Sequence, residues 1–286
     1  MAFTRATELP VTDVQARRPT VQVSLSRVGV TGVEKVIRLR QDGTEQLFSA
    51  RFECVVDLGP EQKGAHMSRF EEVINDVIGE VLLNETSFKA ETLVQHIAER
   101  VRHQQGARRA EVSVEARFPE HKPAPLSGIQ TQELYTLHGS AVASELGTRR
   151  LIGVTAQGMT ACPCAQELVA DHARERLERD GFGSEEIDRI LDAVPVATHN
   201  QRGLGTLHIG CTEVCEDEIE AASVLEIVEG AMSSEIYELM KRSDEVSVVE
   251  KAHRRPRFVE DCVREMVRGV VERFPALDDR AFVSAR

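Results

Sequence analysis

Two cysteines and a histidine are the residues of this chain best suited to chemistry. Cys162 and Cys164 flank Pro163 where an apolar run gives way to a helical pattern, and His199 lies in a polar run further along. Thiolate and imidazole are common ligands of zinc and related divalent ions, and they also form the nucleophile–base pair of thiol catalysis. A helix that begins at the cysteines would stabilise a thiolate through its N-terminal dipole. The same residues are also compatible with buried, unreactive thiols and an ordinary polar loop, since free cysteines are commonly buried.

Two glutamates are further candidates. The apolar spacing predicts a long helix over residues 222–241, in which Glu235 borders the buried stripe. Glu250 follows residues 246–249, whose apolar, β-branched character predicts a short strand. A carboxylate in either place can bind a metal ion or accept hydrogen bonds from a base, and it can equally be a solvated residue at the end of an element.

A candidate anion site precedes the helix expected at residues 70–83. Lys63, His66 and Arg69 lie near its start, where backbone N–H groups and the helix dipole favour anions. Ser68, followed three residues later by a glutamate, is equally typical of an ordinary capped helix.

The composition excludes several classes of protein. The 286 residues are 41% hydrophobic and 29% charged, which predicts a folded core. The net charge of -12 argues against nucleic-acid binding, which needs a basic face. No apolar run approaches the ~20 residues of a membrane span, and residues 1–19 lack the apolar core of a signal peptide. We therefore expect a cytoplasmic protein that contacts neither nucleic acid nor membrane.

The elements that must position the candidate residues separate into strands and helix pairs. This segregation predicts the α+β class, with antiparallel sheets and helix pairs on one face. The expected strands cover residues 21–28, 33–39, 48–58, 110–118, 150–156 and 205–210, and the expected helices cover residues 70–83, 91–104, 164–180, 184–193, 222–241 and 258–274.

The order of these elements is similar in the two halves of the chain, which suggests two modules. Residues 1–19 are expected to form a flexible N-terminal leader. Residues 119–130, with three prolines and Gly128, are the expected linker. The first module would cover residues 20–125, and the second would cover residues 126–286 and carry most of the candidate site residues.

Seven motifs occur along the chain: residues 26–31 (SRVGVT), 63–69 (KGAHMSR), 160–166 (TACPCAQ), 197–203 (ATHNQRG), 235–242 (EIYELMKR), 249–253 (VEKAH) and 258–261 (FVED). In these motifs and their order, the chain closely resembles the second, FolE2-like family of GTP cyclohydrolases. That family comprises the bacterial type IB enzyme and the archaeal iron-dependent enzyme of methanopterin synthesis. The alanine-rich cysteine motif resembles the archaeal branch more than the bacterial one.

The resemblance implies a fold, a reaction and a cofactor. The fold would be a bimodular tunnelling fold, assembled as a homotetramer with active sites at subunit interfaces. The reaction would be the metal-dependent hydrolysis of GTP at C8 with release of formate, giving a dihydroneopterin phosphate for folate or methanopterin-type pterin synthesis. The implied cofactor is one divalent ion per subunit: Fe(II), Mn(II) or Zn(II). The family also has a His-x-His segment near its C-terminus that supplies a metal-site histidine, and these 286 residues contain no such segment.

The resemblance also implies residue roles. Cys162 would be the thiolate ligand or catalytic cysteine, with Cys164 beside it, and His199 would be a metal ligand or proton-transfer group. Glu235 would be a metal-site carboxylate, and Glu250 would anchor the guanine by accepting from its N–H groups. The substrate-binding candidates are the triphosphate-binding cations Lys63, Arg69 and Arg202, together with His66.

Two other functions are compatible with the cysteines. A nitrile reductase of the same tunnelling fold would use a cysteine nucleophile on a deazapurine with NADPH. A non-catalytic zinc or redox protein would use Cys162 and Cys164 without turning over GTP.

Overall fold

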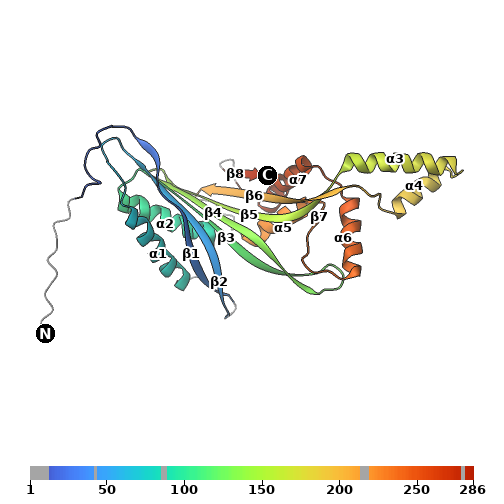
Figure 1. Ribbon diagram of the computed structural model, residues 1–286, viewed down its shortest axis with the longest axis horizontal. Helices are drawn as coiled ribbons and strands as arrows, with labels where there is room; N and C mark the ends of the chain where they lie inside the picture. Colours follow the sequence, from blue (N-terminus) through green and yellow to red (C-terminus); the bar gives the residue numbers. More distant parts are fainter. Residues whose placement is uncertain (1–12, 42–43, 85–88, 213–218, 278–280) are drawn as a thin grey trace.

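The protein is built on one antiparallel sheet. A computed structural model describes residues 13–41, 44–84, 89–212, 219–277 and 281–286. Neighbouring strands follow the order β1-β2-β3-β4-β5-β6-β8, and the short strand β7 pairs with β5 beyond the stretch of β5 that pairs with β4 (Figure 1). The strands are β1 (Leu25–Gln41), β2 (Thr44–Leu58), β3 (Arg109–Pro123), β4 (Gln130–Ser144), β5 (Gly147–Ala161), β6 (Asn200–Thr212), β7 (Ser234–Glu235) and β8 (Phe282–Ala285).

Four helices form one hydrophobic core with the sheet. Every second residue of β4 from Thr131 to Ala143 is buried, as expected when one face of a strand is covered. At Gly139 of β4 a Cβ would lie 2.7 Å from the backbone of Ala90, so only glycine allows helix α2 this close. The helices that contribute to this core are α1 (Met67–Asn84), α2 (Ala90–Gln105), α5 (Ala221–Ala231) and α7 (Val259–Arg273).

A second helix pair projects from the end of the sheet. Helices α3 (Pro163–Arg179) and α4 (Ser184–Ala193) connect β5 to β6, and we call them the arm. The arm extends away from the sheet, and helix α6 (Arg242–Arg254) lies at its base (Figure 1). All of α3 lies in the part of the chain that the structure describes, and no residue of it is buried.

The predicted α+β class, with antiparallel strands and helix pairs, is confirmed. The two strands expected at residues 21–28 and 33–39 are, however, a single strand, β1. The turn expected between them is an irregularity in the pairing with β2, which shifts register between Val30 and Val33. Gly32 lies at this shift with φ 66°, a backbone conformation that favours glycine.

The linker expected at residues 119–130 was wrong. Strand β3 continues to Pro123, and β4 begins at Gln130, so only a tight connection separates two fully paired strands. Strand β4 was not predicted because its inward positions begin with Thr131 and Glu133, which break the apolar alternation that reveals a strand.

The expected boundary between the modules, at residues 125 and 126, falls in the turn between β3 and β4. Both strands belong to the same sheet, and their register runs without interruption. The division into a leader at residues 1–19 and two modules stays a prediction; residues 1–12 lie outside the described residues.

The long helix expected at residues 222–241 was also wrong. Helix α5 ends at Ala231, and the chain turns back onto β5 to form β7. Ser233 makes this turn: its N–H donates to Met159 O at 2.9 Å, and its hydroxyl accepts from Ala161 N–H at 3.1 Å. These hydrogen bonds to the edge of a strand outweigh the helical apolar spacing of the sequence.

The strand expected at residues 246–249 is part of helix α6. Asp244 begins this helix by accepting a hydrogen bond from Lys241 N–H at 2.7 Å. A capped start overrides the β-propensity of a short valine-rich run, because propensity is a weak preference that local hydrogen bonding can reverse.

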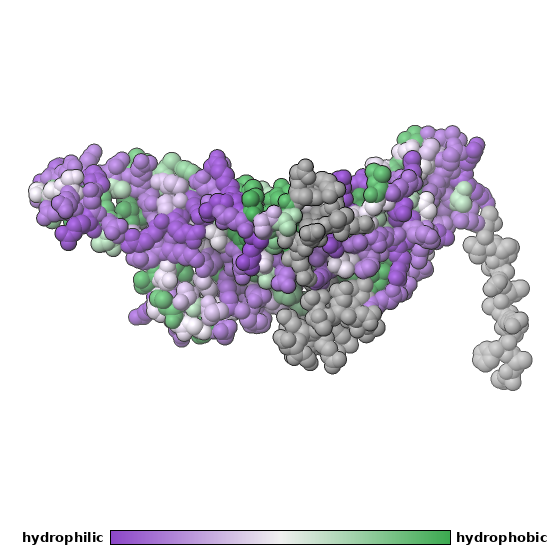
Figure 2. Space-filling view, turned by 180° about the vertical axis from the view of Figure 1, so that it is seen from behind, coloured by the Kyte–Doolittle hydropathy of each residue, from purple (hydrophilic) through white to green (hydrophobic). Residues whose placement is uncertain are grey.

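The surface of the molecule is mostly polar. Seen from behind, hydrophilic residues cover most of the described surface, and hydrophobic residues occur in scattered groups (Figure 2). Within the described ranges, no helix combines the length and the apolar character that crossing a membrane requires.

Candidate active site

Cys162 and His199 lie side by side where the arm joins the sheet. Cys162 N–H donates to His199 O at 3.1 Å, and the Thr198 hydroxyl donates to Cys162 O at 2.8 Å. Cys162 is partly buried at the N-cap of α3, with Pro163 at the first helical position. The ends of β5 and β6 therefore bring the backbones of Cys162 and His199 together, and the exposed Cys164 lies two residues further on, in the first turn of α3.

Gln166 joins the three segments that meet here. Its side-chain amide donates to Val196 O at 2.7 Å and to His253 O at 2.5 Å. One side chain of α3 thereby holds both the returning end of the arm and the end of α6. The motif at residues 160–166 contains Gln166, but its type and spacing alone did not indicate this role.

His253 brings α6 against the same place. Its Nε2 atom lies 3.3 Å from Thr198 O, and its Nδ1 atom lies 2.8 Å from Val249 O. The motif at residues 249–253 contains His253, but the sequence indicated no role for it.

Glu235 lies further back along β5, opposite Gly158. The Tyr237 hydroxyl donates to its Oε1 at 2.8 Å, and Lys251 of α6 forms an ion pair with its Oε2. Burial by itself would raise the pKa of Glu235, but the hydrogen bonds from Lys251 and Tyr237 outweigh it and hold the pKa below its ordinary value. The carboxylate is thus charged and fixed by two donors.

Glu250 lies on α6, and its side chain is 44% exposed. It forms an ion pair with Arg254 at 3.2 Å, one helical turn away. The carboxylate predicted to anchor guanine therefore faces outward from this chain, where a ligand or a second subunit could reach it.

The substrate-binding candidates near the start of α1 lie at the end of the sheet opposite to the arm (Figure 1). His66 and Arg69, at the start of α1, line a cavity of about 640 Å³ that none of the second-half candidates lines. His66 is held by Gln105, whose amide donates to His66 O at 2.9 Å, and Arg69 donates to Gln104 O at 2.9 Å. The backbone N–H of Lys63 donates to Gln15 O at 3.1 Å.

Arg202 is exposed on β6, where it pairs with Met159 of β5. Since side chains alternate along a strand, it lies on the face opposite to Gly203 and Gly205, which border the helices. The single chain therefore brings Cys162 and His199 together, but not with Lys63 and Arg69 at the far end of the sheet.

The donor types of Cys162 and His199 fit two positions of a divalent-metal site. Glu235 does not join them, because it is four residues back along β5 and is held by Tyr237 and Lys251. Among the described residues, no group of three or more His, Cys, Asp and Glu side chains is arranged to hold a metal ion. The described chain thus supplies two candidate ligands rather than a complete site.

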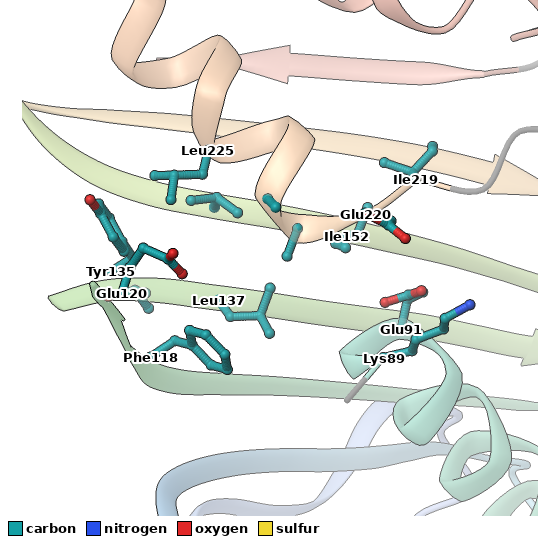
Figure 3. A pocket seen from close by; sticks show the side chains of 14 residues that line it. Lys89, Glu91, Phe118, Glu120, Tyr135, Leu137, Ile152, Ile219, Glu220 and Leu225 are labelled. Carbon is teal, nitrogen blue, oxygen red and sulfur yellow. The ribbon is translucent and has the colours of Figure 1, made fainter. Parts of the chain in front are cut away.

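A separate cavity of about 280 Å³ lies between α2, the sheet and α5 (Figure 3). Phe118, Leu137, Ile152 and Leu225 give it an apolar wall, and none of the predicted site residues lines it. This cavity is therefore distinct from the place where Cys162 and His199 meet.

Comparison with known proteins identifies the family. A family model described as type I GTP cyclohydrolase folE2 matches residues 11–281. GTP cyclohydrolase MptA of Methanocaldococcus jannaschii is 41% identical over 282 residues, which cover 96% of this chain and 88% of that protein. GTP cyclohydrolase MptA of Methanococcoides burtonii is 39% identical over 290 residues, which cover 98% and 90%. The chain belongs to the folE2 family of type I GTP cyclohydrolases, as its motifs predicted.

Among solved structures, the chain is similar to uricases. The uricase from Arthrobacter globiformis has a TM-score of 0.49 and 8% identity, covering 91% of this chain and 80% of that chain. The uricase from Bacillus fastidious has a TM-score of 0.45 and 10% identity, covering 88% and 80%. Similarity at this level adds no argument about activity.

Proposed function

We propose that the protein is a metal-dependent GTP cyclohydrolase. It adds water to C8 of guanine, opens the imidazole ring, and releases C8 as formate in a second hydrolysis. The product is a dihydroneopterin phosphate for folate or methanopterin-type pterin synthesis. The observation that carries this proposal is the juxtaposition of Cys162 and His199 at the base of the arm in a chain of this family.

Cys162 and His199 would hold one divalent ion per subunit: Fe(II), Mn(II) or Zn(II). Such an ion supplies Lewis acidity and a hydroxide nucleophile near neutral pH. Residues of the chain itself position these two ligands. Pro163 and the first turn of α3 place Cys162 at the N-terminus of the helix, and Gln166 holds the returning end of the arm and the end of α6 beside it.

Glu250 would select guanine. Its two carboxylate oxygens match the N1–H and exocyclic amine donors of that base, and its exposure on α6 leaves them accessible. The triphosphate would need cations, for which we propose Lys63, Arg69 and Arg202, with His66 beside them.

A second copy of the chain would complete the site. The cations at the start of α1 and the Cys162–His199 pair lie at opposite ends of one subunit, so both can serve one substrate only across an interface (Figure 1). A homotetramer with interfacial active sites meets this requirement. We also propose that the enzyme acts in the cytoplasm.

The test is anaerobic incubation of GTP with Fe(II), Mn(II) or Zn(II), followed by mass analysis of pterins and assay of formate. Release of formate in proportion to pterin is expected. The double variant Cys162→Ala, His199→Ala should lose both metal and turnover. Undiminished metal content in that variant would contradict the ligand assignment. NADPH oxidation without formate release would instead identify a nitrile reductase.

A further inference from the structure

The cavity between α2, the sheet and α5 combines an apolar middle with polar ends (Figure 3). Phe118 and Leu137 of the sheet and Leu225 of α5 line the middle. Its volume of about 280 Å³ is close to the lower limit of roughly 300 Å³ for small-molecule sites. A ligand that fills this cavity would therefore be small and mostly apolar.

The charged residues that line the cavity are mostly acidic. Within the described part of the chain they are three glutamates and one lysine: Glu91, Glu120, Glu220 and Lys89. Lys89 lies with Glu91 and Glu220 at one end, whereas Glu120 lies beside Tyr135 at the other (Figure 3). The end with Glu120 would therefore attract a cationic group of a ligand and repel an anionic one.

Glu120 is a carboxylate that lacks a cation of its own. It lies directly opposite Glu133 in the pairing of β3 with β4, and like charges in opposed positions destabilise a sheet. Glu133 is compensated by hydrogen bonds from the Thr131 hydroxyl at 3.1 Å and the Glu238 N–H at 2.6 Å. The ion pairs formed by the residues that the structure describes do not include Glu120.

The nearest lysine of β3 already has a carboxylate partner. Lys122 Nζ lies 2.6 Å from the Oε1 of Glu229, which also accepts from the Tyr135 hydroxyl at 3.1 Å. Burial raises the pKa of Tyr135, and the negative charges of Glu229, Glu133 and Glu120 raise it further. A second cation beside Glu120 would therefore balance charge that Lys122 leaves uncompensated.

We propose that this cavity binds a small organic amine with a short hydrocarbon chain. The ammonium group of the ligand donates to the carboxylate of Glu120, and its chain lies against Phe118, Leu137 and Leu225. The Tyr135 hydroxyl, which donates to Glu229, can accept a further hydrogen bond from the ammonium group. None of the predicted site residues lines the cavity, so this site is separate from the proposed site of GTP hydrolysis.

The experiment measures the binding of hexylamine, hexanol and hexanoate to the full-length protein by calorimetry near neutral pH. We expect hexylamine to bind at least about tenfold more tightly than hexanol, because a hydrogen bond between two charged groups is stronger than one that involves a neutral group. Hexanoate should bind more weakly than either. Hexylamine should also raise the thermal midpoint, because a ligand that binds only the folded state stabilises it.

Two variants and a control locate the site. Glu120→Gln should weaken hexylamine binding by about tenfold and leave hexanol binding unchanged, because the charge is lost and the apolar contacts remain. Leu225→Phe should weaken the binding of both ligands, because the larger ring occupies the cavity. The control is Glu226→Gln, which removes an exposed carboxylate of α5 that does not line the cavity and lies 3.8 Å from Arg273. It should change neither affinity.

Four results would overturn the proposal. They are no saturable binding of hexylamine, equal affinities of the wild-type protein for hexylamine and hexanol, equal losses in Glu120→Gln and Glu226→Gln, and a folded Leu225→Phe protein that binds hexylamine as tightly as wild type. The thermal midpoint without ligand shows whether each variant is folded. If Leu225→Phe does not fold, the comparison of the two glutamate variants decides. These measurements need neither metal nor GTP, so their outcome is independent of the proposed function.

Discussion

The contacts of Glu250 within its own chain do not indicate the role that we propose for it. The carboxylate is half-exposed on α6 and paired with Arg254, a contact that by itself contributes little to stability. Its proposed role depends on a ligand whose two N–H donors match its two oxygens. A substitution that keeps shape and removes charge can separate the two roles.

Replacing Glu250 with Gln should therefore abolish most GTP turnover and spare folding. The amide of the variant would place an N–H donor against an N–H donor of guanine. The loss of such a charged, bidentate contact costs roughly 2–5 kcal/mol of binding free energy. Turnover should fall by at least about two orders of magnitude, since each 1.4 kcal/mol is about tenfold. Steady-state kinetics and metal analysis check this.

Glu245→Gln is the matched control, because Glu245 is an exposed glutamate in the first turn of the same helix. It should keep wild-type turnover. Near wild-type efficiency in the Glu250 variant would show that the guanine contact is made elsewhere.

A histidine pair lies on the sheet face opposite the helices. The rings of His138 and His208 are 5.2 Å apart, and His138 Nε2 lies 2.8 Å from the Thr155 hydroxyl. His208 fits because a Cβ at Gly153 would lie 2.3 Å from its ring. Burial, then the neighbouring His138 and Arg286, lower the pKa of His208 to about 4, against a small opposing effect of Glu115.

The stability of the protein should consequently fall in mild acid. The unfolded chain takes up a proton at His208 near pH 6.5, while the folded chain resists it until about pH 4. Where the unfolded state binds more protons, stability rises with pH, so the unfolding free energy should decline as the pH is lowered across this range. His208→Gln should flatten the decline, measured by urea unfolding at several pH values. The exposed His172→Gln should not, and equal slopes for all three proteins would exclude the effect.

At the scale of elements, α6 depends on one buried carboxylate. Asp244 accepts from the N–H groups of Leu126 and Ser127 at 2.9 and 2.8 Å, from the Ser127 hydroxyl at 2.6 Å, and from Lys241 N–H at 2.7 Å. The turn between β3 and β4 is thereby joined to the start of the helix that carries Glu250 and Lys251.

Replacing Asp244 with Asn should loosen both elements together. The amide nitrogen would face the hydroxyl of Ser127 or the N–H of Lys241, leaving buried donors unsatisfied. Hydrogen exchange should show faster exchange in α6 and in residues 124–129, with a lower thermal midpoint.

The control is Asp261→Asn, which alters the equivalent cap of α7: Asp261 accepts from Phe258 N–H at 3.2 Å and is 40% exposed. It should affect only the first turn of α7. If protection of α6 is unchanged by Asp244→Asn, the helix is held by its apolar contacts instead.

At the scale of the whole molecule, the separation of the candidate residues is the main consequence of the fold. The start of α1 and the base of the arm lie at opposite ends of the sheet (Figure 1). If one substrate contacts both, the two contacts come from different subunits.

Mixing two inactive variants tests this arrangement. Arg69→Ala and Glu250→Gln should each reduce GTP turnover, and co-expression should restore activity that neither has alone, because some interfaces then combine two intact halves. Sedimentation should show that the active species is larger than a monomer. An active monomer would place the whole site within one chain. The same conclusion would follow if the co-expressed variants turned over GTP no faster than the sum of the two variants measured separately.

The sequence alone determined the family and most of the elements. The cysteine and histidine motifs identified the family because ligand types and their order along the chain are local properties. Amphipathic spacing located α1, α2, α4 and α7 because each of these helices buries part of one side, whereas α3 was expected from its helical pattern although none of its residues is buried.

Only the tertiary structure decided what depends on contacts between distant segments. Ser233 ends α5 by bonding to β5, and Asp244 begins α6 where a valine run favours a strand. β4 buries Thr131 and Glu133, which no apolar pattern reveals. Tyr237 reaches Glu235 through a segment without regular structure. In each case a polar group finds a partner far along the chain, and no periodicity within a short window encodes such a partner.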